Sequence, residues 1–180
     1  DDENQRITGS ANIRYTNNSP DSLKYIWLQM DQNRFNPKTS IDIAGETVSP
    51  DMDGMSFSAM RSHIERRNFD GGFKVSRLQD LNGSDLSYTV VGSNLRIDLP
   101  IELGPNQATD FAIDWYYNVL DSEILRSRQA AEYFERDDNY IYEIAQWYPR
   151  VTVYSDYEGW HNKEYQGSGE FTLEFGNYDV

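Results

Sequence analysis

The sequence predicts an all-β domain, a two-sheet sandwich or saddle with one short helix in an insertion. Runs with the two-residue alternation of β-strands recur along the 180 residues. Clusters of Asn, Asp, Gly and Pro separate these runs as turns. Only one window has the spacing of an amphipathic helix. Because strand follows strand with no helix between most of them, we expect one β domain over residues 1–180.

The first two strands are predicted on either side of a turn. Residues 7–15 (ITGSANIRY) place Ile7, Ala11, Ile13 and Tyr15 on one side, as in a strand with one buried face. Residues 17–21 (NNSPD) have turn chemistry. Residues 23–30 (LKYIWLQM) are nearly continuously apolar, which predicts burial on both faces. We expect the two strands to form a hairpin.

The insertion follows. Residues 32–53 lack a periodic pattern and predict a long excursion. Residues 56–68 carry Phe57, Met60 and Ile64 at helical spacing, with Ser56 or Ser58 as the N-terminal cap. The Asp-Gly-Gly at residues 70–72 is expected to end this helix.

Strands are predicted again over the rest of the chain. They cover residues 73–81, 86–91, 95–99 and 110–119, the last with Phe111, Ile113 and Trp115 on one face. Residues 121–138 are highly charged and predict a partly helical or disordered segment. Further strands are expected at residues 140–145, 150–154 and 169–175.

Composition excludes several classes of function. The formal net charge is -14 and the sequence pI about 4.4, so duplex nucleic acid and anionic membranes would be repelled. An acidic excess of this kind is also typical of an ordinary solvated surface. The absence of Cys excludes disulfides, thiolate zinc sites and cysteine nucleophiles. No window is apolar enough for a transmembrane segment, and no signal peptide is evident.

Motifs for catalysis or metal binding are missing from the sequence. His63 and His161 are far apart, and there is no HExxH. The DMDG at residues 51–54 lacks the remaining ligands of an EF-hand. No GxSxG or phosphate-binding loop occurs. The late carboxylates do not form a recognisable glycosidase pair. These are Glu143, Asp156, Glu158, Glu164 and Glu170. We therefore expect no catalytic residue, metal ligand or cofactor site in this chain.

Aromatic residues are concentrated in residues 144–162 (IAQWYPRVTVYSDYEGWHN), which hold two Trp, three Tyr and one of the two His. Pro149 forces the preceding backbone to be extended, so the rings could pack at the edge of the sandwich. The rings at loop ends could instead contact a ligand. An independent carbohydrate-binding β-sandwich is therefore one hypothesis, and its stacking rings would be Trp147, Tyr148, Trp160 and Tyr165. A purely structural or adhesive β module is another.

The same stretch resembles a known family. AQWYPR at residues 145–150, DYEGW at 156–160 and GSGEF at 167–171 resemble the end of the N-terminal β domain of zinc aminopeptidases of the aminopeptidase N family, in a bacterial branch. The opening, residues 7–30, resembles the early strand pair of that domain. Residues 35–81 do not contribute to the resemblance.

The resemblance implies a non-catalytic N-terminal domain that packs against a C-terminal zinc-binding catalytic domain. It implies that this chain is that first domain, truncated before its last strands, and that zinc belongs to the absent catalytic domain. In the family this domain helps form the substrate cleft, and one side chain holds the free α-amine of the peptide. Gln146 is the first candidate for that role and Glu143 the second, with Trp147 and Tyr148 beside them.

One segment departs from the family pattern, where F-P-C-x-D-E-P is replaced by VTVYSDY at residues 151–157. The missing Pro and Glu leave the geometry of the loop and strict aminopeptidase specificity open. The resemblance also implies a location outside the cytoplasm, either periplasmic, secreted or attached to a membrane.

Overall fold

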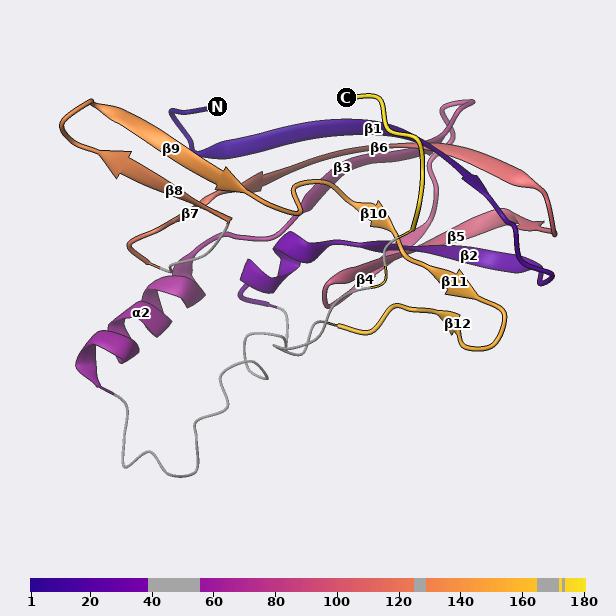
Figure 1. Ribbon diagram of the computed structural model, residues 1–180, viewed down its shortest axis with the longest axis horizontal. Helices are drawn as coiled ribbons and strands as arrows, with labels where there is room; N and C mark the ends of the chain where they lie inside the picture. Colours follow the sequence, from indigo (N-terminus) through magenta and orange to yellow (C-terminus); the bar gives the residue numbers. More distant parts are fainter. Residues whose placement is uncertain (39–55, 125–128, 165–171, 173) are drawn as a thin grey trace.

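Two antiparallel sheets are packed against each other (Figure 1). The computed structural model describes residues 1–38, 56–124, 129–164, 172 and 174–180. The first sheet has the order β1-β6-β3, with β1 at Arg6–Thr16, β6 at Ala108–Asn118 and β3 at Lys74–Asp80. The second has the order β10-β2-β5-β4, with β10 at Arg150–Val151, β2 at Leu23–Gln29, β5 at Asn94–Leu103 and β4 at Tyr88–Val91. The all-β prediction is confirmed.

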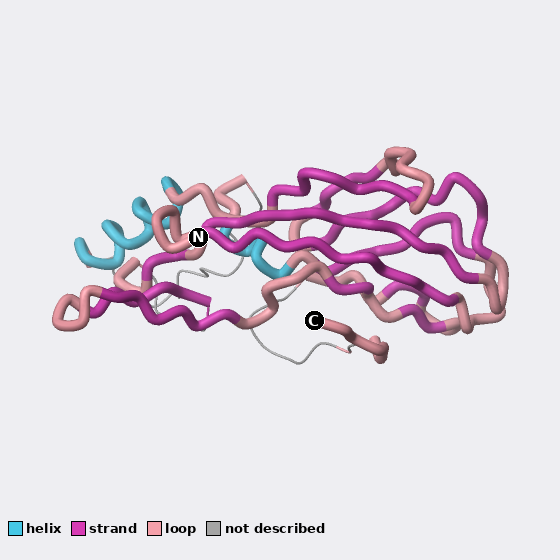
Figure 2. The backbone as a smooth tube through the Cα atoms, turned by 90° about the horizontal axis from the view of Figure 1, so that it is seen from above, coloured by secondary structure: helices cyan, strands magenta, loops and turns pink. Residues whose placement is uncertain are grey.

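A third unit of strands projects from one end of the sandwich, at the left of Figure 1 and of Figure 2. It consists of the hairpin β8 (Gln129–Phe134) and β9 (Asn139–Ile144), with the short β7 (Leu120–Asp121) parallel to β8. A small hairpin, β11 (Tyr154–Ser155) and β12 (Gly159–Trp160), lies at the other end. One 3-10 helix, η1 (Asp31–Phe35), follows β2, and α2 spans Phe57–Asn68. Among the described residues, no helix is long and apolar enough to cross a membrane.

The core lies between the two sheets. Strand β6 contributes Phe111, Ile113, Trp115 and Tyr117 from one face, and each of these side chains is almost fully buried. Strands β2 and β5 supply the opposing layer. Its members are Ile26, Leu28, Leu95 and Ile97. The alternation read in residues 110–119 therefore marks the central strand of the first sheet, because one face of that strand meets the other sheet.

The predicted hairpin between the first two strands is wrong. Strand β1 pairs with β6, from Arg6 opposite Asn118 to Thr16 opposite Ala108, while β2 pairs with β5 and β10. The turn at residues 17–21 instead carries the chain from one sheet to the other. Its buried Asn17 donates from Nδ2 to the carbonyl oxygens of Asp21 (2.7 Å) and Leu103 (3.0 Å). Both strands can then turn their apolar faces toward the same core.

Burial of both faces of β2 is only partly realised. Ile26 and Leu28 face the core and are fully buried, whereas Lys24 and Tyr25 are exposed. The near-continuous apolar run did not predict burial of both faces correctly, because large aromatic side chains can also lie on a partly exposed face.

Residues 129–134 form the regular strand β8, which corrects the expectation of a partly helical or disordered segment. They pair with β9 from Gln129 opposite Ile144 to Phe134 opposite Asn139. The charges that obscured this strand cluster in the exposed turn at residues 135–138. Residues 125–128 lie outside the described residues.

Other boundaries also differ from the predictions. The strand expected at residues 150–154 is reduced to the two short strands β10 and β11. Most of the strand expected at residues 169–175 lies outside the described residues, and Thr172, Glu174 and Phe175 are not in a strand. The excursion predicted over residues 32–53 begins with η1, and residues 39–55 are not described.

Helix α2 has the bounds that the sequence predicts, but its apolar residues do not join the core. Phe57 is 86% exposed, Met60 45% and Ile64 50%. The helix therefore gains little stability from packing among the described residues.

Candidate functional site

The segment that carries the predicted site residues connects the projecting hairpin to the second sheet. It leaves β9 after Ile144 and enters β10 at Arg150. Gln146 has a φ of 53°, a left-handed backbone conformation that non-glycine residues seldom adopt. The buried side chain of Gln32 donates from Nε2 to the carbonyl oxygens of Ala145 (3.2 Å) and Gln146 (3.4 Å). A second part of the chain therefore fixes the turn at Gln146.

The rings after this turn connect the core to the end of the chain. The ring centroid of Trp147 lies 6.3 Å from that of the buried Trp115 and 5.0 Å from that of Tyr148. The ring of Tyr148 is in turn 6.0 Å from that of Tyr178. Trp147 and Tyr148 are half-buried. Both rings therefore pack within the protein, and Trp147 contributes to the edge of the core.

An ion pair holds the far end of the segment. Arg150 donates from Nη2 to Oδ2 of Asp31 at 2.6 Å, and these side chains are only 12% and 11% exposed. Together with the buried Pro149, the pair fastens β10 to η1. Breaking such a shielded pair leaves an uncompensated charge, so this contact constrains the position of the whole segment.

Glu143 lies on a different surface from the rings. In β9, Tyr140, Tyr142 and Ile144 are half-buried on one face, while Glu143 is exposed on the other, opposite Ala130. Burial, with a smaller contribution from the Asp2 carboxylate, raises the pKa of Tyr142. The structure thus brings Trp147 and Tyr148 into contact after the turn at Gln146 and separates Glu143 from them by the pleat of the strand.

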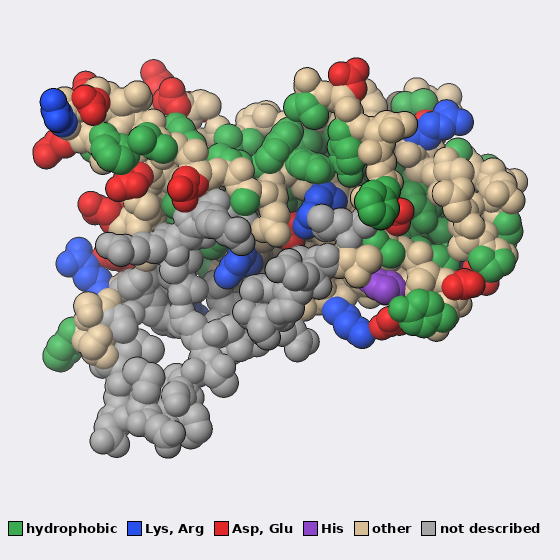
Figure 3. Space-filling view, viewed as in Figure 1, with side chains coloured by type: hydrophobic (Ala, Val, Ile, Leu, Met, Phe, Trp, Pro, Cys, Tyr) green, Lys and Arg blue, Asp and Glu red, His purple; other side chains and the backbone are tan. Residues whose placement is uncertain are grey.

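Acidic side chains surround this end of the molecule (Figure 3). The exposed carboxylates of the β8–β9 hairpin are Glu132, Glu135, Asp137, Asp138 and Glu143. Such a surface attracts cationic groups and repels anions at long range.

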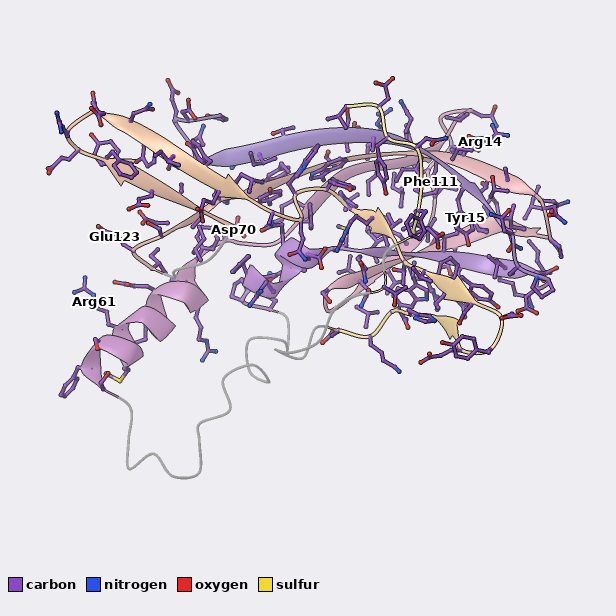
Figure 4. All side chains as sticks on the ribbon, in the orientation of Figure 1. Arg14, Tyr15, Arg61, Asp70, Phe111 and Glu123 are labelled. Carbon is purple, nitrogen blue, oxygen red and sulfur yellow. The ribbon has the colours of Figure 1, made fainter. Side chains whose placement is uncertain are left out.

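A second aromatic cluster lies at the other end of the sandwich, where Tyr15 and Phe111 are labelled in Figure 4. The ring of Trp160 is 5.9 Å from that of Tyr15 and 5.2 Å from that of Tyr154. The Tyr154 hydroxyl donates to Oδ2 of Asp21 at 2.7 Å, and this bond is the main cause that raises the pKa of Tyr154 to about 12. Trp160 is thus engaged with two tyrosines. Tyr165, the remaining ring of the carbohydrate-binding hypothesis, lies outside the described residues.

A Ser, a His and a Glu meet beside this cluster, but not as a catalytic triad. Ser155 Oγ lies 2.9 Å from Nε2 of His161. Glu158 Oε2 is 3.8 Å from the same nitrogen, and its Oε1 accepts from Lys163 at 2.8 Å. In a triad the acid binds the other ring nitrogen and orients the imidazole. The arrangement therefore fits a structural role for His161 in the β11–β12 loop.

Two residues of the candidate site were not found by sequence reasoning. Asp31 and Gln32 follow β2 in a segment without periodicity, and their partners lie more than one hundred residues later. No local pattern encodes such contacts. Within the part of the chain that the structure describes, no group of three or more His, Asp or Glu side chains could hold a metal ion.

No family model, curated protein or solved structure matches this chain.

Proposed function

We propose that this chain is the non-catalytic N-terminal domain of a zinc aminopeptidase-like metallopeptidase. Its role is to pack against a catalytic domain and to form part of the cleft that holds the N-terminus of a peptide. The AQWYPR segment and its neighbours support the proposal, together with the β architecture. On this proposal, the zinc and the hydrolytic chemistry would belong to the catalytic domain.

The turn at Gln146 carries the proposal. Two carbonyl contacts from Gln32 and the ion pair between Arg150 and Asp31 hold this turn on both sides. An amide oxygen on a fixed turn can accept a hydrogen bond from the ammonium of a peptide and orient the substrate. Trp147 and Tyr148 stabilise the turn from the core side. The acidic surface of the adjacent hairpin favours the approach of a cationic N-terminus.

The test uses the protein translated from the whole reading frame and an aminoacyl reporter substrate. The variant Gln146→Gly removes the acceptor while keeping the positive φ, which glycine adopts freely. We expect KM to rise about tenfold or more, the loss typical of one hydrogen bond to a charged group.

Glu143→Gln is the matched variant for the second candidate. If Gln146 holds the amine, Glu143→Gln leaves KM nearly unchanged. If Glu143 holds the amine, Glu143→Gln raises KM and Gln146→Gly leaves it nearly unchanged. The proposed role of the domain would then stand, with Glu143 as the residue that binds the amine. Unchanged KM in both variants would contradict a role for this segment in binding the substrate amine.

A further inference from the structure

A pocket of about 400 Å³ lies where the projecting hairpin meets the sandwich. Its walls come from the start of β1, the end of α2, the junction of β6 with β7, and the β8–β9 hairpin. Figure 4 labels Asp70 at this junction, beside the end of α2. The volume is within the range of small-molecule sites in proteins. Neither Gln146 nor the rings beside it line this pocket.

The guanidinium of Arg6 is held in a fixed orientation in the wall. Its Nε donates to Oδ1 of Asn118 at 3.1 Å, and the guanidinium lies 4.7 Å from the centroid of the Tyr116 ring. Asn118 is itself fixed, because its Nδ2 donates to the carbonyl oxygen of Asp70 at 2.9 Å. The hydrogen bond to Asn118 uses Nε and not the two terminal nitrogens, which can together bind one carboxylate.

Among the described residues Arg6 has no carboxylate partner within 4.0 Å, although the chain has a net charge of -14. Other arginines of the sandwich, such as Arg14, Arg77 and Arg150, do form ion pairs. Arg6 lines the pocket, and an anionic group bound beside it would neutralise its charge.

The same pocket also contains negative charge. Asp70 and Asp121 both line it. Asp70 uses Oδ1 for Lys74 at 3.0 Å, and Asp121 uses Oδ1 to accept from the backbone of Glu123 at 2.8 Å. Each carboxylate retains a second oxygen. Arg6 and Asp121 thus line one pocket without forming an ion pair with each other, whereas Asp70 is paired with Lys74.

We propose that this pocket binds a small zwitterion, an α-amino acid or a dipeptide. Its carboxylate pairs with Arg6, its ammonium lies toward Asp121, and its side chain contacts Val119 and Tyr140. A simple anion would meet the Asp121 carboxylate, and a simple cation would meet Arg6. A zwitterion satisfies both sides, and the apolar part of the wall accepts an aliphatic side chain.

This site is independent of the proposed function. Tyr140 lines the pocket from one face of β9, whereas Glu143 lies on the opposite face. Loss of zwitterion binding therefore leaves the role of Gln146 untouched, and the reverse also holds.

Calorimetric titration of the chain with leucine, leucylglycine, N-acetylleucine and leucinamide tests the proposal. We expect saturable binding of leucine or leucylglycine, and whichever of the two binds more tightly distinguishes an amino acid from a dipeptide. N-Acetylleucine lacks the ammonium and leucinamide lacks the carboxylate, so each should bind about tenfold or more weakly. No saturable binding of either zwitterion, or equal binding of N-acetylleucine, would overturn the proposal.

Two variants locate the site. Arg6→Gln should weaken binding of the zwitterion about tenfold or more. The control is Arg14→Gln. Arg14 is on the same strand as Arg6 but near the other end of the sandwich, where it forms an exposed ion pair with Asp110 (Figure 4). This variant should bind the zwitterion as tightly as the wild type. Equal affinity of Arg6→Gln and the wild type would refute the site.

A measurement on the wild-type chain covers the case in which Arg6→Gln does not fold. Methyl NMR signals of Val119, Ile124 and Ala131, which line the pocket, should shift as leucine or leucylglycine is added. Shifts confined to methyl groups elsewhere would place the ligand outside this pocket and overturn the assignment.

Discussion

In Tyr117, the buried ring and the buried hydroxyl have opposite effects on the stability of the core. Its ring is 1% exposed and meets the ring of Phe73 at 5.2 Å, edge to face. Its hydroxyl is buried without a hydrogen-bond partner within the described residues. Burial also raises the pKa of Tyr117 well above its usual value of 10.0. The ring therefore stabilises the core while the hydroxyl costs free energy.

We predict that Tyr117→Phe keeps or raises the free energy of unfolding at pH 7, by up to about 1 kcal/mol. Above pH 10 the unfolded tyrosine loses its proton while the folded one retains it. A raised folded pKa thus gives stability that is complete below pH 10 and is lost as the pH rises further. The variant should lose less stability between pH 7 and pH 11. Part of the dependence should remain, because the pKa values of Tyr15 and Tyr154 are each raised to about 12.

Urea denaturation at the two pH values measures this effect. Tyr88→Phe, at an exposed position of β4, is the control and should behave like the wild type at pH 7. A large loss of stability in Tyr117→Phe at pH 7 would show that its hydroxyl has a favourable partner.

The ion pair between Asp31 and Arg150 gives a second test at the residue scale. We expect Asp31→Asn to lower the free energy of unfolding by about 3 kcal/mol, since the guanidinium would remain shielded without its partner. Arg14→Gln breaks an exposed pair at 3.4 Å and should cost less than about 1 kcal/mol. Equal costs in denaturant unfolding would show that the buried pair does not anchor β10 to η1.

At the scale of elements, local patterns predicted strands well and their partners poorly. The alternation in residues 7–15 and 110–119 marked β1 and β6 because each has one face on the core. The pairing of β1 with β6 depends on contacts about one hundred residues apart, such as Ile7 opposite Tyr117. Proximity in sequence favoured the wrong hairpin. The buried amide of Asn17 instead stabilises the turn that carries the chain to the other sheet. Its hydrogen bond to the carbonyl oxygen of Leu103 depends on a residue far away in the sequence, so no local pattern predicts it.

In the candidate site, too, local sequence predicted the position of residues but not their contacts with distant segments. The sequence indicated where the aromatics gather, and the structure places Trp147 beside Trp115 and Tyr148. It did not indicate that Gln146 has a positive φ or that Gln32 holds its carbonyl oxygen, because both depend on a distant segment. The pocket around Arg6 also draws its residues from four separate parts of the chain.

Helix α2 provides a prediction at this scale. Its Ile64 is half-exposed, so Ile64→Ala should change the free energy of unfolding by less than about 0.5 kcal/mol. Ile113→Ala, in the fully buried layer of β6, should cost about 3 kcal/mol because it leaves a cavity. Comparable losses in the two variants, measured by urea denaturation, would mean that α2 packs on the core after all.

At the scale of the whole molecule, the sandwich supports a projecting hairpin and the turn at Gln146. The core between the two sheets fixes Trp115, which positions Trp147, and the ion pair to η1 fixes the far side. Under the proposed function, a packed scaffold of this kind would hold the turn at Gln146 in a precise position. The acidic surface around the hairpin adds attraction for an amine at long range.

The central proposal is that this domain serves a zinc peptidase whose metal is held by another domain. The most direct test measures zinc content and hydrolysis of aminoacyl reporters for two samples, residues 1–180 alone and the protein from the whole reading frame. We predict stoichiometric zinc and turnover in the longer protein, and neither in the shorter chain. Tightly bound metal or turnover in residues 1–180, or a longer protein without zinc, would contradict the account.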